Sequence, residues 1–174
     1  MLRQIAEYKN VRYHLLLVDE FDAMDQWPAG AAYFSLFIYL DEDVKSKQAI
    51  APFKRFAKSA LLAGVKSVYC CGLMASWLDD LFDYEEMFLK WESNPDTQDE
   101  EISSDDDSSD DIVMTYFNTR DFDMDELVWE FMSITSATEL FEPHIWDKVA
   151  IFKKSDPNWK RYRRSLRIWT EKGL

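Results

Sequence analysis

The sequence predicts one α/β domain over residues 1–174, with three layers and a mostly parallel sheet of four or five strands flanked by helices. The 174 residues are 47% hydrophobic and 16% aromatic, which is enough apolar material for one core. Short apolar runs alternate with amphipathic segments from residue 32 to the C-terminus. This alternation is typical of parallel strands joined by helices.

Two strands are expected in the first forty residues. Residues 12–21, RYHLLLVDEF, contain an apolar run that is short for a helix and is followed by acidic residues. Pro28 and Gly30 then indicate a loop. Residues 32–40, AYFSLFIYL, are apolar almost throughout, which suits a central strand covered on both faces.

Helix and strand alternate in the middle of the chain. Residues 46–63 have apolar side chains at helical spacing, with a possible start near Pro52 and a stop at Gly64. VKSVYCCG, at 65–72, predicts a strand, and 74–91 predicts a second helix. The apolar residues expected on this second helix are Trp77, Leu78, Leu81, Phe82, Phe88 and Leu89.

The last third repeats the pattern. Residues 111–117, DIVMTYF, predict a strand, and Asp123 with Glu126 forms a possible capping box that opens a helix. WDKVAIFKK, at 146–154, predicts the last strand. A final helix over 156–171 is expected because it starts with Asp and Pro, which suit an N-cap and a first turn.

An acidic run separates the second helix from the next strand. Residues 96–111 contain nine Asp or Glu and almost no apolar side chain. Such a segment cannot bury enough surface to offset the entropy of ordering, so a disordered insertion is expected at about 94–110. The run contains no glycine, which a calcium-binding loop needs for its sharp turn.

The net charge of −13 is unevenly distributed. Residues 79–130 hold twenty Asp or Glu and two cationic side chains, whereas residues 153–172 hold eight Lys or Arg and two carboxylates. A negative field disfavours nucleic acid and anionic membrane at the acidic surface and accelerates encounter with a cationic molecule. The acidic surface therefore predicts a basic protein partner.

The cellular location expected from the sequence is cytoplasmic. No stretch approaches the roughly 18 apolar residues needed to cross a bilayer, and charges interrupt residues 1–20 where a signal peptide would be apolar. Two adjacent cysteines do not form a disulfide framework.

Cys70 and Cys71 precede Gly72 at a strand-to-helix junction, where helix amides can lower the pKa of a thiol. A cysteine phosphatase would need an arginine about six residues later, where Trp77 stands. His14 and His144 carry no mark of a catalytic base. The favoured reading is that both cysteines pack in the core.

An alternative site consists of carboxylates that follow the first two strands. Asp19, Asp22, Asp41 and Asp43 could meet at the carboxyl edge of the sheet and hold a divalent cation. A similar acidic pocket occurs in bacterial receiver domains, but the phosphate-accepting Asp of those domains is not evident, and solvated acidic turns are the favoured reading. The sequence has neither a Walker A motif nor a G-x-G-x-x-G turn, so no nucleotide cofactor is expected.

The segment IVMTYFNTRDFDMDELVWEFM, at 112–132, resembles a small acidic bacterial α/β family of unknown function. A strand, a polar turn, an Asp-Glu pair and an aromatic helix recur in that family. The resemblance covers roughly residues 32–152, implies an α/β fold and brings no catalytic residues. The acidic insertion and the basic final helix have no counterpart in it.

The leading functional prediction is an acidic protein that neutralises a basic partner, most concretely an immunity protein or inhibitor of a bacterial toxin such as a nuclease. The alternatives are a divalent-metal-dependent hydrolase or phosphotransfer module, and a regulatory or scaffold subunit that uses the basic final helix. That helix could also meet the acidic insertion or an acidic partner. The predicted contacts with a basic partner are Asp79, Asp80, Asp83, Glu85, Glu86, Asp121, Asp123 and Asp125. The scaffold alternative uses Arg161, Arg163 and Arg164.

Overall fold

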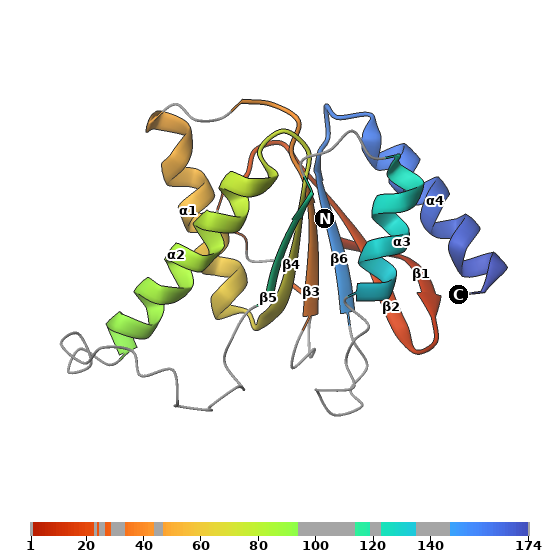
Figure 1. The fold of residues 1–174 in the computed structure, drawn as a ribbon, viewed down its shortest axis with the longest axis horizontal. Helices are drawn as coiled ribbons and strands as arrows, with labels where there is room; N and C mark the ends of the chain where they lie inside the picture. Colours follow the sequence, from red (N-terminus) through yellow and green to blue (C-terminus); the bar gives the residue numbers. More distant parts are fainter. Residues whose placement is uncertain are drawn as a thin grey trace.

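The chain folds as an α/β structure with one mixed sheet and helices packed against it (Figure 1). The computed structural model describes residues 2–22, 24, 27–28, 34–43, 47–93, 114–118, 123–134 and 147–173. The strands are β1 (Leu2–Tyr8), β2 (Val11–Val18), β3 (Phe34–Tyr39), β4 (Val65–Cys71), β5 (Met114–Asn118) and β6 (Asp147–Lys153). The helices are α1 (Lys47–Leu62), α2 (Ala75–Ser93), α3 (Met124–Ile134) and α4 (Asn158–Lys172).

The strand order is β1-β2-β6-β3-β4-β5, so β1 and β5 are the two edge strands. The pairs β2–β6, β6–β3, β3–β4 and β4–β5 are parallel, and only β1–β2 is antiparallel in the part of the chain described. The α/β class is therefore confirmed. The expected count of four or five strands is corrected to six, because Leu2–Tyr8 folds back on β2.

A tight hairpin joins β1 to β2. Lys9 and Asn10 have φ values of 49° and 66°, and Tyr8 is paired with Val11. Two consecutive residues with positive φ are typical of the type I′ turn, whose twist matches that of the strands it joins. This turn gives β1 its antiparallel direction and leaves it at the edge of the sheet.

Two apolar clusters cover the two faces of the sheet, because successive side chains of a strand point to opposite sides. The first cluster includes Leu36 and Ile38 with the buried residues of α1 and α2. The second includes Phe37 with the buried residues of α3 and α4. Figure 1 shows α1 and α2 together on one side of the sheet and α3 and α4 on the other.

Several predicted boundaries shift in the structure. Helix α1 begins at Lys47, so Pro52 lies inside the helix instead of at its start. The first turn of α3 is closed by the backbone carbonyl of Asp123, which accepts from the N–H groups of Glu126 and Leu127. The N-cap of α4 is Pro157, which has no side-chain cap, so Asp156 lies one residue before the N-cap position expected for it; its carboxylate accepts from the N–H of Asn158 at 2.8 Å. The predicted insertion at 94–110 lies outside the described residues.

Candidate functional site

The exposed side of α2 carries a row of aromatic side chains. Tyr84, Phe88 and Trp91 are 43%, 41% and 37% exposed. Spacings of four and three residues place them on one side of the helix. The ring centroids of Tyr84 and Phe88 are 5.4 Å apart, and those of Phe88 and Trp91 are 6.0 Å apart. We call these three residues the aromatic stripe.

The stripe accounts for half of the large apolar side chains that are exposed among the described residues. The other three are Leu62, Leu73 and Trp129. Single exposed apolar side chains are common on protein surfaces, whereas contiguous ones mark interaction sites. The sequence analysis expected Phe88 among the apolar residues of this helix but did not identify an exposed aromatic row.

Carboxylates lie beside the stripe on the same helix. Asp80 and Asp83 are both exposed, and Asp80 stands one turn before Tyr84. Thr115 on β5 donates a hydrogen bond to Asp83 at 3.2 Å. Both residues carry an accessible negative charge next to exposed rings, and their role as partner contacts stays a prediction.

Asp79 lies deeper between α2 and the sheet edge. Burial raises the pKa of Asp79; a hydrogen bond from Thr115 offsets part of this rise, and the nearby charges of Asp83 and Asp80 add to it. Its Oδ1 atom is buried and has no hydrogen-bond partner in the described part of the chain. A cation at this end of α2 would relieve the repulsion among the three carboxylates.

One cation already lies over the stripe. The Nζ atom of Lys54, on α1, is 4.7 Å from the centroid of the Tyr84 ring. The same ammonium group is 3.6 Å from Oε1 of Glu85, which is buried. The side of α2 next to α1 therefore combines an aromatic face with a carboxylate, the pairing that binds ammonium and guanidinium groups.

The remaining predicted contacts are engaged within the protein. Glu86 pairs with Lys90 at 3.1 Å. Asp123 pairs with Arg161 at 3.1 Å.

Asp125 accepts a hydrogen bond from Ser165. Asp123 and Asp125 begin α3, which packs on the face of the sheet opposite to α2, so the predicted residues do not form one surface (Figure 1). Asp121 lies outside the described residues.

Two of the four carboxylates of the alternative metal site pair with separate cations. Asp19 contacts Lys154 at 2.6 Å, and Asp22 accepts two hydrogen bonds from Arg55 at 2.6 and 2.9 Å. Asp41 accepts from the hydroxyl of Tyr39 at 3.3 Å. Such pairs are typical of solvated ends of strands.

Asp43 is exposed after β3. Among the residues that the structure describes, no group of three or more His, Cys, Asp or Glu is arranged to hold a metal ion. Lys153 lies between two further carboxylates, with its Nζ atom 3.0 Å from Glu20 and 2.5 Å from Glu42. The carboxyl edge is thus a set of ion pairs.

Cys70 and Cys71 are buried on opposite faces of β4, one in each apolar cluster. Burial raises the pKa of both thiols well above the ordinary value. A thiol that resists ionisation is a poor nucleophile. The geometry therefore agrees with the packing role that was favoured for both residues.

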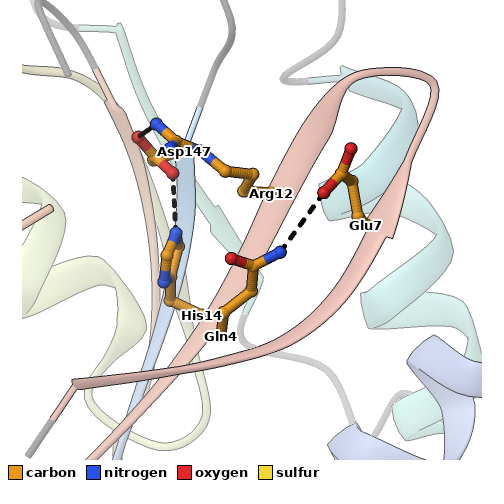
Figure 2. A network of polar contacts seen from close by, with 5 residues as sticks. All are labelled: Gln4, Glu7, Arg12, His14 and Asp147. Carbon is orange, nitrogen blue, oxygen red and sulfur yellow. Dashed lines mark hydrogen bonds and ion pairs between the residues drawn. The ribbon is translucent and has the colours of Figure 1, made fainter.

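A buried ionic network lies at the start of β2 and β6, and the sequence analysis did not predict it (Figure 2). The carboxylate of Asp147 is fully buried and contacts Nη2 of Arg12 and Nε2 of His14, each at 2.6 Å. The parallel register pairs Arg12 with Asp147, which brings together residues 135 positions apart. Both oxygens of the carboxylate are satisfied by β2, so the network joins two central strands.

No protein-family model matches the chain, and a search of curated proteins found no match. None of the described helices is long and apolar enough to cross a membrane. The aromatic stripe, with Asp80 and Asp83 beside it, joins three exposed rings and two exposed carboxylates on one helix.

Proposed function

We propose that the protein binds a basic protein through the aromatic stripe and the carboxylates of Asp80 and Asp83. The observation that carries the proposal is the exposure of three contiguous aromatic rings beside these charges. Arginine and lysine side chains stack on aromatic rings and pair with carboxylates. Aromatic side chains also supply much of the binding energy at protein interfaces.

In its narrower form, the proposal is that binding neutralises the partner, as an immunity protein or inhibitor does with a toxin such as a nuclease. The net charge of −13 supports this form, since nucleases present cationic clefts to their substrates. Carboxylates on a rigid helix could take the place of phosphates in such a cleft. In this proposal the domain has three layers, with the sheet in the middle and α2 in one of the two outer layers.

The test uses tagged protein to capture partners from an extract of the source cells at low salt. Asp80→Asn/Asp83→Asn and Phe88→Ala/Trp91→Ala should both lose one basic protein that the wild type captures. With the purified partner, the aromatic double variant should weaken affinity by about 2 kcal/mol or more. The charge variant should mainly slow association, because exposed charges act chiefly on encounter.

Trp129→Ala is the matched control, because Trp129 is equally exposed but lies on α3. It should bind the partner as the wild type does. Capture of the same protein by all variants would contradict the proposed surface. If the partner is a nuclease, its cleavage rate should fall in proportion to added wild-type protein, and unchanged cleavage would contradict the neutralising form.

A further inference from the structure

A groove of about 580 Å³ lies between α4 and the edge strand β1. We propose that this groove binds an acidic segment of another protein in an extended conformation. This inference does not depend on the function proposed for α2. The residues of the lining that carry the argument are Ile5 and Ala6 of β1 and Lys160, Arg163, Arg164 and Arg167 of α4.

Four cationic side chains of α4 line the groove. Lys160, Arg163, Arg164 and Arg167 follow the spacing i, i+3, i+4 and i+7, which places them along one side of the helix. From the first to the last they span about 10 Å, given a rise of 1.5 Å per residue. The positive charge is therefore spread along the groove instead of converging on one point.

These cations are poorly neutralised within the protein. Neither Arg163 nor Arg164 has a carboxylate within ion-pair distance among the described residues. Arg167 reaches Glu171 only at 3.9 Å, and both side chains are largely exposed. Arg161, on the same helix but outside the groove, does pair with a carboxylate, Asp123. In a chain with a net charge of −13, unpaired arginines gathered in one groove indicate an anionic ligand from outside.

The opposite wall of the groove is apolar. The register of β1 and β2 shifts between Gln4 and Ala6, and both Ile5 and Ala6 pack against the second apolar cluster. Gln4 and Glu7 are cross-strand partners of His14 and Arg12 and therefore share the face with the Asp147 network (Figure 2). The carboxylate of Glu7 thus points away from the groove.

The position of β1 favours a polypeptide over other anions. An edge strand presents backbone N–H and C=O groups to which an extended peptide can add. Alternate side chains of such a peptide point the same way about 7 Å apart, a spacing that fits cations distributed over 10 Å. A nucleic acid cannot add a strand to the sheet through these backbone groups, and the negative charge of the rest of the molecule would repel a long polyanion.

The occupant that we propose is a segment of another protein. Residues 96–111 of the same chain are acidic, but they lead into β5, which is at the opposite edge of the sheet from β1. A partner segment is free of this constraint. A protein that binds an acidic segment here and a basic protein at α2 would hold two partners on opposite faces of its sheet.

The test measures fluorescence anisotropy of a labelled decapeptide in which Glu and Thr alternate, at low salt. The wild type should bind it, and Arg163→Gln/Arg164→Gln should weaken binding by about tenfold, because two charge-assisted contacts are lost. Arg161→Gln, with the same charge change on the same helix, should change affinity less than about twofold. N-methylation of alternate peptide residues should also weaken binding about tenfold, since it prevents strand addition.

Three results would overturn the proposal. In the first, the folded wild type does not bind the peptide, but a variant in which the carboxylates of residues 96–111 are neutralised does bind it. The acidic run of the same chain would then be the ligand of the groove. The second is equal binding by Arg163→Gln/Arg164→Gln. The third is tighter binding of a single-stranded oligonucleotide or of inorganic phosphate than of the peptide. A control decapeptide with Lys in place of Glu should not bind.

Discussion

At the scale of single residues, two consecutive buried charges at the start of β6 take partners on opposite faces of the sheet. Asp147 faces β2 and contacts Arg12 and His14. Lys148 faces the other way, and its Nζ atom donates to the backbone carbonyls of Phe131 and Met132, each at 3.0 Å. These carbonyls are in the last turn of α3, where no further turn of helix can satisfy them. Lys148 therefore caps α3 from within the core.

This position predicts a pH-dependent contribution of Lys148 to stability. Burial lowers the pKa of Lys148 to about 7. At pH values between about 7 and the ordinary pKa of lysine, Lys148 is protonated in the unfolded chain but has lost its proton in the native state. The free energy of unfolding therefore rises with pH over this range. Below pH 7 both states are protonated, and the cost of burying the charge is fully present.

The stability of Lys148→Met relative to the wild type should therefore be greatest at pH 6 and should fall as the pH rises to about 10, because only the wild type becomes more stable over this range through Lys148. Urea unfolding of both proteins at pH 6, 8 and 9.5 measures the difference. Lys154→Met is the control for removing a lysine next to the same strand. A difference between wild type and Lys148→Met that does not change with pH would contradict the prediction.

At the scale of elements, the sequence pattern predicts most of the fold because apolar period and strand length are local properties. Each strand from β2 to β6 overlaps a predicted one, and α1 to α4 were all expected. Strand β1 was missed because RQIAE lacks an apolar run, and its pairing depends on the turn at Lys9 and Asn10. Pro52 suggested the start of a helix, because proline lacks the backbone N–H that the interior of a helix uses. The loss of this one donor does not interrupt α1, which continues through Pro52.

The candidate site was only partly predictable, for a related reason. Charge counting along α2 identified Asp80 and Asp83, which are exposed. Periodicity alone cannot decide which apolar side chains of a helix meet the sheet, so the exposure of Phe88 could not be predicted from its spacing. The Asp147 network and the groove beside β1 depend on strand register and order, which involve residues far apart in the sequence.

The turn between β4 and α2 gives a prediction at this scale. Gly72 has a φ of 92°, and a Cβ atom there would lie 2.6 Å from the carbonyl oxygen of Leu40. That backbone is fixed, since Leu40 donates to the carbonyl of Cys71 and accepts from the N–H of Met74. Gly72→Ala should therefore destabilise the protein by about 2–4 kcal/mol, combining a strained φ with a backbone clash.

Urea unfolding measures this loss. Gly173→Ala is a suitable comparison, because Gly173 also has a positive φ but its added Cβ would lie 3.7 Å from the nearest atom, the hydroxyl of Tyr8. It should cost less than Gly72→Ala. Equal stability of Gly72→Ala and wild type would show that the turn can move.

At the scale of the whole molecule, the two charged surfaces lie on different faces of the sheet. Helix α2 carries Asp80 and Asp83 on one side, and α4 carries the groove cations on the other (Figure 1). The two surfaces lie on opposite faces of the sheet, and in the solvent around each of them the field of exposed charges falls off over a Debye length of about 8 Å at physiological ionic strength. Each surface can therefore attract its own partner without neutralising the other.

The acidic run at 96–111 should add to the attraction exerted by α2, which it follows in the chain. The prediction rests on the proposed binding of a basic protein. Replacing its nine carboxylates by Asn and Gln keeps the length of the segment and removes only charge. Association with the basic partner should become slower at about 0.05 M salt, because long-range attraction raises the rate of encounter. The dissociation rate should be unchanged, since that rate depends on contacts made in the complex.

Stopped-flow association at low and high salt separates these effects. At about 0.5 M salt the wild type and the neutralised protein should associate at the same rate, because the Debye length is then only a few ångströms. Phe88→Ala/Trp91→Ala is the opposite control, with faster dissociation and nearly unchanged association, since uncharged contacts act after encounter. Faster dissociation of the neutralised protein would mean that the acidic run contacts the partner directly in the complex. This result would contradict the prediction that the run acts only by long-range attraction.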